Sequence, residues 1–228
     1  MSDETTARTA AFYDVDGTLV GTNVIHAYLY YAINSPGILD RLTSLASLAA
    51  EAPLYWLAEK FDRKAFNEAF YRKYEGFTED RLVVLGEEVF ENVIRPNLFD
   101  GARDLIEQSK SEGHDQILVT GALDVVTRPL AEFLGADDFA ANRLEYKDGV
   151  ATGGLRDPMM AGANKAEWIR RTAEDRKYDL DRSFAYADSE SDLPMLSVVG
   201  NPCAVNPELG LRTKANSYGW PILDFQEG

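Results

Sequence analysis

The sequence contains little cysteine and little positive charge. Cys203 is the one cysteine among 228 residues, so no internal disulfide can form. It lies in the apolar run 203–205, which favours a role in core packing over that of a reactive thiol. Lysine and arginine number 23 against 38 aspartates and glutamates, which gives a formal net charge of -15. Such an acidic surface repels phosphate backbones, so we expect no nucleic-acid partner.

The chain also lacks an apolar stretch long enough to cross a bilayer. Residues 1–9 are polar and carry no signal-peptide core, so we expect a cytoplasmic protein. Residues 42–57 are rich in apolar side chains, but Glu51 and Pro53 interrupt the segment, which is shorter than a membrane span. We therefore predict no stable membrane insertion and assign this segment to helix packing. Contact with a lipid surface is the weaker alternative.

A pair of aspartates follows the first apolar run of the chain. Residues 10–13 predict a short buried strand, and residues 14–18, Asp-Val-Asp-Gly-Thr, follow it directly. Asp14 and Asp16 are two positions apart, so an extended chain points both carboxylates to one side. Gly17 beside them allows a sharp turn or the close approach of a ligand. Such a pair can divide the chemistry, because one carboxylate can attack while the other transfers a proton.

The spacing of apolar residues changes along the chain. Residues 23–96 show helical spacing with no convincing strand, whereas strand and helix patterns alternate after that segment. The alternation predicts an α/β fold, with a Rossmann-like, three-layer, mostly parallel sheet core and an inserted all-helical cap. We assign residues 1–22 and 97–228 to the core and residues 23–96 to the cap. Residues 147–149, Lys-Asp-Gly, predict a hairpin turn within the second core segment.

Three further polar clusters lie at predicted strand ends or helix starts. Thr120 and Gly121 follow an apolar strand and could cradle a phosphate with a hydroxyl and open backbone. Lys165 begins a predicted helix, where its ammonium could neutralise an anion. Asp188 and Asp192 follow another strand and offer the oxygen ligands that Mg²⁺ takes. Each residue alone also fits a turn, a helix cap or a solvated position, but together they favour one shared site.

These motifs resemble those of the haloacid dehalogenase-like (HAD) superfamily of phosphatases over nearly the whole chain. The segment from Asp14 to Thr18 matches the first motif of that superfamily, Asp-x-Asp-Gly-Thr. The other motifs are matched by Thr120, by Lys165, and by Asp188 with Asp192. The helical insertion between the first and second motifs resembles the cap of subfamily IB, the group that includes phosphoserine phosphatases.

The resemblance implies a phosphomonoester hydrolase that uses Mg²⁺ and an aspartyl-phosphate intermediate. In the family pattern Asp14 is the nucleophile and Asp16 the general acid and base. The metal ligands would be the carboxylates of Asp14 and Asp188 and the backbone carbonyl of Asp16, while Asp192 would orient metal-bound water or the lysine. The phosphoryl oxygens would be bound by Thr120, by the N–H of Gly121 and by Lys165.

Two positions depart from the phosphoserine phosphatase pattern. Asn23 stands where those enzymes carry a glutamate that binds the substrate ammonium, and Ser191 stands where their fourth motif has asparagine. We therefore predict a small phosphorylated metabolite other than phosphoserine, with Asn23 and His26 as candidate cap contacts. Most of the aromatic residues of the cap are expected to pack its helices, and a few could line a less polar pocket that would suit a larger or lipid-like ester. A phosphotransferase with the same intermediate and a non-catalytic module that binds a phosphorylated metabolite are the alternatives; the sequence does not define the oligomeric state.

Overall fold

The computed structural model describes residues 8–34, 42, 46–50 and 63–225. Most of the apolar segment 42–57 lies outside the described residues, so the expected packing of that segment stays a prediction. Among the described helices, none combines the length and the apolar character that a membrane span requires.

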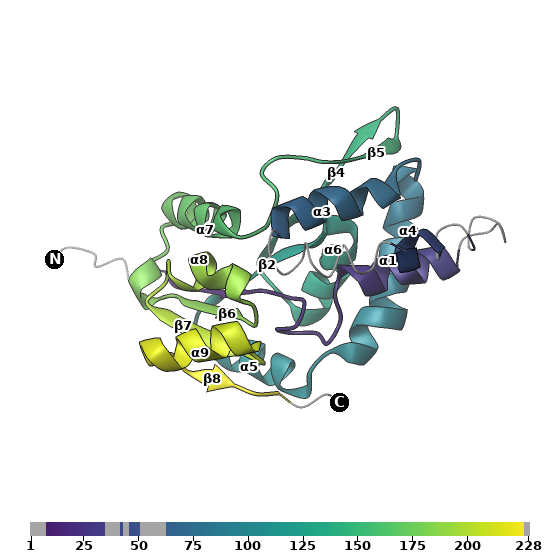
Figure 1. The fold of residues 1–228 in the computed structure, drawn as a ribbon. Helices are drawn as coiled ribbons and strands as arrows, with labels where there is room; N and C mark the ends of the chain where they lie inside the picture. The colour runs from purple at the N-terminus through teal and green to yellow at the C-terminus, as the bar shows by residue number, and fades with distance from the viewer. Residues whose placement is uncertain (1–7, 35–41, 43–45, 51–62, 226–228) are drawn as a thin grey trace.

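A six-stranded sheet forms the centre of the molecule (Figure 1). Every neighbouring pair in this sheet is parallel. The first strand lies in the middle, so its carboxyl end is flanked by the ends of two others. In spatial order the strands are β3 (Asp138–Asn142), β2 (Asp115–Leu123), β1 (Ala10–Tyr13), β6 (Phe184–Ala187), β7 (Asn201–Val205) and β8 (Ile222–Leu223).

Helices cover both faces of this sheet, because successive strand residues point to opposite sides. In β1, Tyr13 belongs to the core that includes helices α5 (Asp100–Ser111) and α6 (Asp124–Leu134). Phe12 belongs to a second core on the other face. That second core includes α7 (Ala163–Arg176), α8 (Leu193–Leu196) and α9 (Leu209–Tyr218). The predicted three-layer α/β fold is therefore confirmed.

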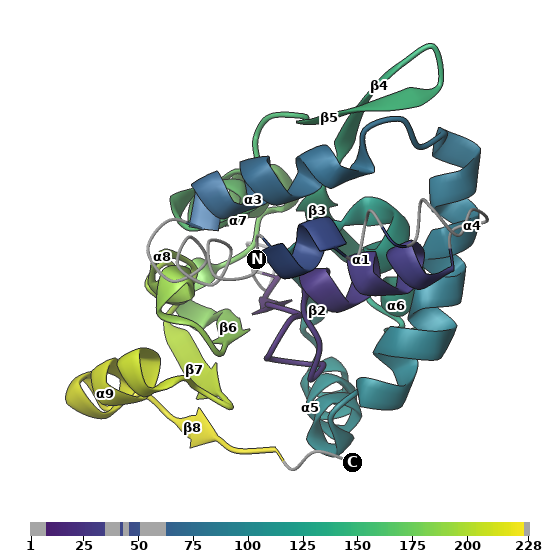
Figure 2. The same cartoon turned by 45° about the vertical axis from the view of Figure 1, so that its right-hand side comes forward.

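The described part of residues 23–96 is helical (Figure 2). Its elements are α1 (Val24–Ile33), α3 (Arg63–Tyr71), the 3-10 turn η1 (Arg72–Tyr74), α4 (Glu79–Val89), the π-turn η2 (Phe90–Ile94) and the 3-10 turn η3 (Arg95–Asn97). Their aromatic rings pack on one another: Phe70 stacks on Phe66 and meets Tyr28 edge to face. These buried rings form the core of the helical segment, which is the packing role expected for most of the aromatic residues.

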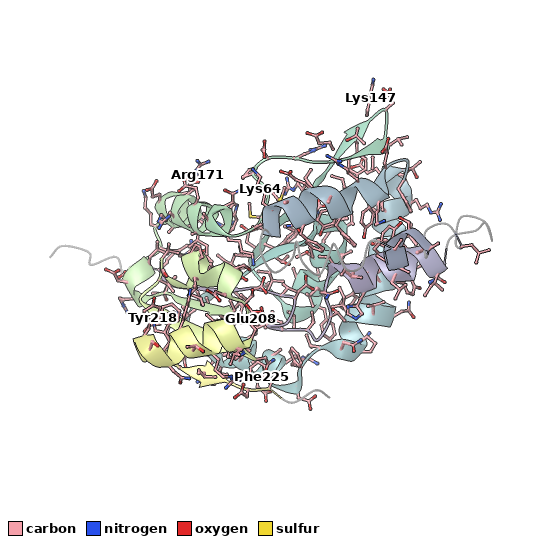
Figure 3. The ribbon with its side chains drawn as sticks, in the orientation of Figure 1. Lys64, Lys147, Arg171, Glu208, Tyr218 and Phe225 are labelled. Atoms are coloured by element: carbon pink, nitrogen blue, oxygen red, sulfur yellow. The ribbon has the colours of Figure 1, made fainter. Side chains whose placement is uncertain are left out.

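The predicted hairpin is present, but its packing on the helical segment was not predicted. Strands β4 (Leu144–Lys147) and β5 (Val150–Leu155) are joined through Asp148 and Gly149, whose φ angles are 52° and 76°. Positive φ at both turn residues is typical of a type I′ hairpin turn. Lys147 lies at the outer end of this hairpin (Figure 3). The hairpin packs on the helical segment: Ala151 accepts from the N–H of Gly76 at 2.9 Å and donates to the carbonyl of Phe77 at 2.8 Å.

Three local features lie beyond what the sequence pattern predicts. β2 continues through Leu123 beside β3, so α6 begins only at Asp124. β3 itself was not predicted. Thr78 holds the N-cap position of α4, but its side chain makes no capping hydrogen bond. The N–H of Glu79 instead donates to the carbonyl of Gly149 at 3.0 Å, and the acidic residues of the first turn, Glu79 and Asp80, suit the helix dipole.

The environment of Cys203 predicts an inert thiol. The side chain is 7% exposed on β7, and burial raises the pKa of the thiol to about 11. Since the thiolate is the reactive form, we expect native Cys203 to react with a thiol reagent at least about a hundredfold more slowly than in the unfolded chain. Labelling by Ellman's reagent with and without urea measures both rates. Equal rates would contradict this prediction and restore the reactive-thiol alternative.

Candidate active site

The carboxylate of Asp14 lies at the centre of the site, directly after β1. Its side chain is 4% exposed, and its Oδ1 lies 2.6 Å from Nζ of Lys165. The same Nζ lies 2.8 Å from Oδ1 of Asp192. Lys165 is in the first turn of α7, and Asp192 immediately precedes α8. A buried lysine therefore bridges two aspartates that are far apart in the sequence.

These charges determine the protonation state of Lys165. Burial alone would lower its pKa, but the attraction and hydrogen bonds of Asp14 and Asp192 outweigh this effect and hold the pKa above the ordinary value. Lys165 therefore remains a cation throughout the physiological pH range. A permanent positive charge beside a buried carboxylate provides charge compensation at the point where an anionic substrate would approach.

Asp188 reaches the same centre from the end of β6. The hydroxyl of Thr18 lies 3.3 Å both from Oδ2 of Asp14 and from Oδ1 of Asp188. Gly17 adopts a φ of 80°, and a Cβ at this position would collide with the carboxylate of Asp188. The conformation and the close approach both require glycine here. Thr18 was matched only as part of the first motif, and its contact with both carboxylates was not predicted.

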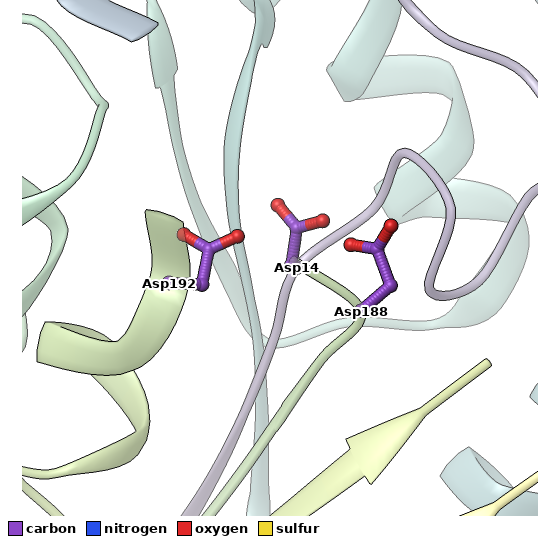
Figure 4. A group of neighbouring side chains, drawn as sticks. All are labelled: Asp14, Asp188 and Asp192. Carbon is purple, nitrogen blue, oxygen red and sulfur yellow. The ribbon is translucent and has the colours of Figure 1, made fainter. Parts of the chain in front are cut away.

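The carboxylates of Asp14, Asp188 and Asp192 form a group that suits a divalent metal ion (Figure 4). Each can contribute one oxygen, and these oxygens all lie within 4.8 Å of one another. Three carboxylates and one lysine leave an excess of two negative charges, which a divalent cation would balance. Hard cations such as Mg²⁺ take oxygen ligands of this kind. The donor set therefore fits the predicted metal.

Thr120 and Gly121 lie in an irregular part of β2. The pairing register of β2 with β3 shifts between Val119 and Leu123, so this segment departs from regular strand geometry. The buried hydroxyl of Thr120 accepts a hydrogen bond from the N–H of Ala122 at 3.0 Å. This local bond lies in the carboxyl-terminal part of β2, just beyond the pairing of Leu118 with Tyr13 at the end of β1.

Two side chains from other elements hold the carbonyl oxygen of Gly121. The hydroxyl of Tyr71 donates to it at 2.7 Å, and so does the side-chain amide of Asn142 at 2.7 Å. Asn142 ends β3, whereas Tyr71 ends α3 of the helical segment. Neither residue was predicted. Because Tyr71 is 50 positions from Gly121, no local sequence signal could have identified their contact.

The side chain of Asp16 is not among the three carboxylates of the group that suits a metal ion, and it lines a small pocket. Among the side chains that line this pocket, Asp16 is the one that carries a charge. Most of the others are apolar and come from the segment after β1, from α1, from β2, from η2 and from α6. They include Val24, Ala27, Ile94, Ala122, Val126 and Leu130. Asp16 therefore brings a single charge to an otherwise uncharged and largely apolar recess.

Asn23 and His26 form a capping box at the start of α1. Oδ1 of Asn23 accepts from the N–H of Ile25 at 3.1 Å, and the N–H of Asn23 donates to Nδ1 of His26 at 3.2 Å. These bonds satisfy free donors of the first helical turn. Asn23 also lines the pocket beside Asp16. His26 is exposed, so the structure gives it a capping role and brings only Asn23 to the pocket.

Comparison with known proteins identifies the family. The model of the haloacid dehalogenase-like hydrolase family matches residues 11–197. The chain therefore belongs to this family of enzymes, as its motifs predicted.

Two relatives and one solved structure agree with this assignment. A probable phosphatase of Mycobacterium tuberculosis is 33% identical over 96% of this chain and 76% of its own length. A phosphoserine phosphatase of the same organism is 33% identical over 95% of this chain and 71% of its own. The crystal structure of a protein of unknown function from Bordetella pertussis Tohama I is similar with a TM-score of 0.85 and 26% identity, over 96% of this chain and 99% of that one. These findings confirm the predicted class, the HAD-like phosphoric monoester hydrolases.

Proposed function

We propose that this protein is a Mg²⁺-dependent phosphomonoester hydrolase that works through an aspartyl-phosphate on Asp14, and that phosphoserine is not its main substrate. The observation that carries the proposal is the bridge formed by Lys165, whose Nζ lies 2.6 Å from Asp14 and 2.8 Å from Asp192. This bridge keeps the Asp14 carboxylate anionic and places a cation where phosphoryl oxygens would bind.

The reaction would proceed in two displacements. An oxygen of Asp14 attacks phosphorus, the P–O bond to the alcohol breaks, and Asp16 gives its proton to the leaving oxygen. Asp16, now a carboxylate, then takes a proton from a water molecule as that water attacks the phosphorus of the aspartyl-phosphate. The bond between phosphorus and Asp14 breaks, which releases inorganic phosphate and restores both aspartates. Lys165 and Thr120 would hold the phosphoryl oxygens during both steps.

Asp14, Asp188 and the backbone carbonyl of Asp16 would hold Mg²⁺, with Asp192 orienting its water or Lys165. When bound, this ion supplies positive charge against the phosphoryl group and reduces its repulsion with the nucleophile. Within the protein, Thr18 would fix the angle between Asp14 and Asp188, since its hydroxyl lies 3.3 Å from each. Orientation of the ligands by such neighbouring groups is typical of catalytic metal sites.

The pocket beside Asp16 supports a leaving group other than serine. The alcohol must lie near Asp16 to receive its proton, and the neighbouring lining is mostly apolar. An ammonium and a carboxylate, as serine carries, would lose their hydration there without gaining an opposite charge. A small, uncharged and partly apolar alcohol would instead bury its carbon atoms at Val24, Ala27 and Leu130. We therefore expect neutral phosphomonoesters to be preferred.

Phosphate release from a panel of esters tests the proposed function. The panel contains phosphoserine and phosphates of neutral alcohols of increasing size, each assayed with and without Mg²⁺. We expect release that requires Mg²⁺ and a ratio kcat/KM that is higher for the neutral esters. Equal values for phosphoserine and the neutral esters would contradict the substrate assignment. Added acceptor alcohols that capture the phosphate at the expense of its release would instead identify a phosphotransferase.

Gly17→Ala is expected to weaken the use of Mg²⁺. A Cβ at this position would displace the Asp188 carboxylate. We expect the Mg²⁺ concentration for half-maximal activity to rise by about tenfold to a hundredfold, the range found when groups that orient metal ligands are lost. Titration of activity with Mg²⁺ measures this change.

Gly113→Ala is the matched control for this substitution. Gly113 has a φ of 89°, but nothing lies within 4 Å of the position of its Cβ. Both variants therefore carry the strain of positive φ, and only Gly17→Ala meets the carboxylate. The same Mg²⁺ requirement in both variants would show that the close approach of Gly17 to Asp188 is unimportant.

A further inference from the structure

Asn67 is a buried amide whose donor has no partner among the described residues. It lies on α3 and is 2% exposed. Its Nδ2 is fully buried, and no described group lies at hydrogen-bond distance and angle. A buried donor that loses its hydrogen bonds to water without replacement destabilises the folded state. Such a group calls for an explanation, and a bound ligand is one.

The direction of Asn67 is set by its neighbour one turn later. Tyr71 lies four positions further along α3, so the two side chains lie on the same face of the helix. The hydroxyl of Tyr71 donates to the carbonyl of Gly121 at 2.7 Å. Nδ2 of Asn67 lies 3.6 Å from the point that a Cβ on Gly121 would occupy. The free donor of Asn67 therefore faces Gly121, in the same irregular part of β2 that Tyr71 contacts.

This part of β2, formed by Thr120 and Gly121, is the phosphate cradle of the proposed function, on which the inference rests. Gly121 follows Thr120, and a side chain at Gly121 would take up the space between Asn67 and the backbone carbonyl of Met160, which lies 3.4 Å from the same Cβ point. An amide N–H is a suitable donor to an anionic oxygen, since hydrogen bonds to charged groups are stronger than those between neutral ones. It also adds no charge to a centre that already contains Lys165.

We propose that Asn67 is a substrate-binding residue whose Nδ2 donates a hydrogen bond to an oxygen of the bound phosphoryl group. Core residues and a helix of segment 23–96 then bind the phosphoryl group together. Tyr71 holds α3 against Gly121 and keeps the amide in position. In the absence of a phosphorylated ligand, the amide donor is left without its acceptor.

Binding of inorganic phosphate to the Mg²⁺-loaded protein tests this inference without turnover. Isothermal titration gives its dissociation constant for the wild type, for Asn67→Leu, which removes the donor at similar size, and for Asn67→Asp, which replaces it with a carboxylate. We expect this constant to rise about tenfold in Asn67→Leu and further in Asn67→Asp. Asn67→Ala, which makes the side chain smaller, provides a second donor deletion that avoids overpacking.

The melting temperature separates this role from a purely structural one. Because Asn67→Leu removes an unpaired buried donor, we expect its melting temperature without phosphate to be unchanged or higher. A fall in melting temperature with unchanged phosphate affinity would assign Asn67 to internal packing and overturn the inference. Asn92→Asp, an exposed substitution in η2 of the same segment, controls for added charge and is expected to bind phosphate as the wild type does.

The steady-state constants for a neutral ester give a second comparison. We expect KM to rise about tenfold in Asn67→Leu, with kcat changing less, because the hydrogen bond forms to the ground-state phosphoryl group as well. Equal KM and equal phosphate affinity in Asn67→Leu and the wild type would overturn the inference. A wild type that neither binds phosphate nor releases it from any ester would overturn the proposed function too. Phosphate binding and release by the wild type are therefore measured before the variants are compared.

Discussion

Asp14→Asn is expected to abolish phosphate release while leaving the protein folded. The amide keeps the shape of the side chain but lacks the anionic oxygen that would attack phosphorus. We expect kcat/KM to fall by at least about a thousandfold, since loss of the nucleophile removes the covalent route entirely. Lys165 keeps its second partner, Asp192, at 2.8 Å, so the buried ammonium remains paired. Phosphate release at saturating Mg²⁺ and circular dichroism measure the two outcomes.

Asp104→Asn is the matched control for this loss. Asp104 is an exposed residue of α5, and its substitution removes the same charge from a surface position. We expect it to retain wild-type activity. Acid quench of the wild type during turnover of a radiolabelled ester should also leave label on the peptide that contains Asp14. Release that persists in Asp14→Asn would exclude the aspartyl-phosphate mechanism.

The sheet could be predicted where apolar residues run without interruption. Residues 10–13 and 117–119 are continuous apolar runs, and both are buried strands in the structure. β3 (Asp138–Asn142) was missed because aspartate and asparagine end it and no β-branched residue lies within it. It pairs with β2 through backbone groups, which any sequence can supply, and packing against α6 keeps it in place.

The site could be predicted where it depends on strand ends. The ends of parallel strands meet at one edge of a sheet, so Asp14 and Asp188 were expected together and are found together. The contacts of Asn67 and Tyr71 could not be predicted, because they depend on how α3 docks on β2. Neither residue stands in a motif. The packing of the hairpin on α3 was missed for the same reason, since this contact leaves no pattern in the hairpin sequence.

Asn23 shows that a helix-capping signal can coincide with a predicted substrate contact. Asparagine before an apolar helix is a preferred N-cap, and a hydrogen-bonding residue three positions later completes a capping box. The sequence contains this pattern at Asn23 and His26, and the structure forms it. The phosphoserine phosphatase pattern predicts a substrate contact at the same position. The capping role explains why these two residue types stand here whatever the substrate is.

Lys165→Met is expected to impair both stability and activity. Methionine has a similar length but no charge, so the buried carboxylates of Asp14 and Asp192 would lose the cation that they share. Removing one partner of a buried ion pair typically lowers the free energy of unfolding by about 3–5 kcal/mol. Urea unfolding without Mg²⁺ measures this loss. We also expect kcat/KM to fall by about a hundredfold to a thousandfold, because a fixed charge at the phosphoryl oxygens is lost.

Lys147→Met separates this effect from a general effect of the substitution. Lys147 lies at the outer end of the β4–β5 hairpin (Figure 3), is exposed and has no acidic partner among the ion pairs of the described residues. Its substitution is expected to change the free energy of unfolding by less than about 0.5 kcal/mol and to leave activity unchanged. If Lys165→Met unfolded at the same urea concentration as Lys147→Met, the carboxylates would not depend on Lys165 for compensation. The electrostatic basis of the proposed mechanism would then be wrong, because the carboxylates would be stable in the folded protein without the positive charge of Lys165.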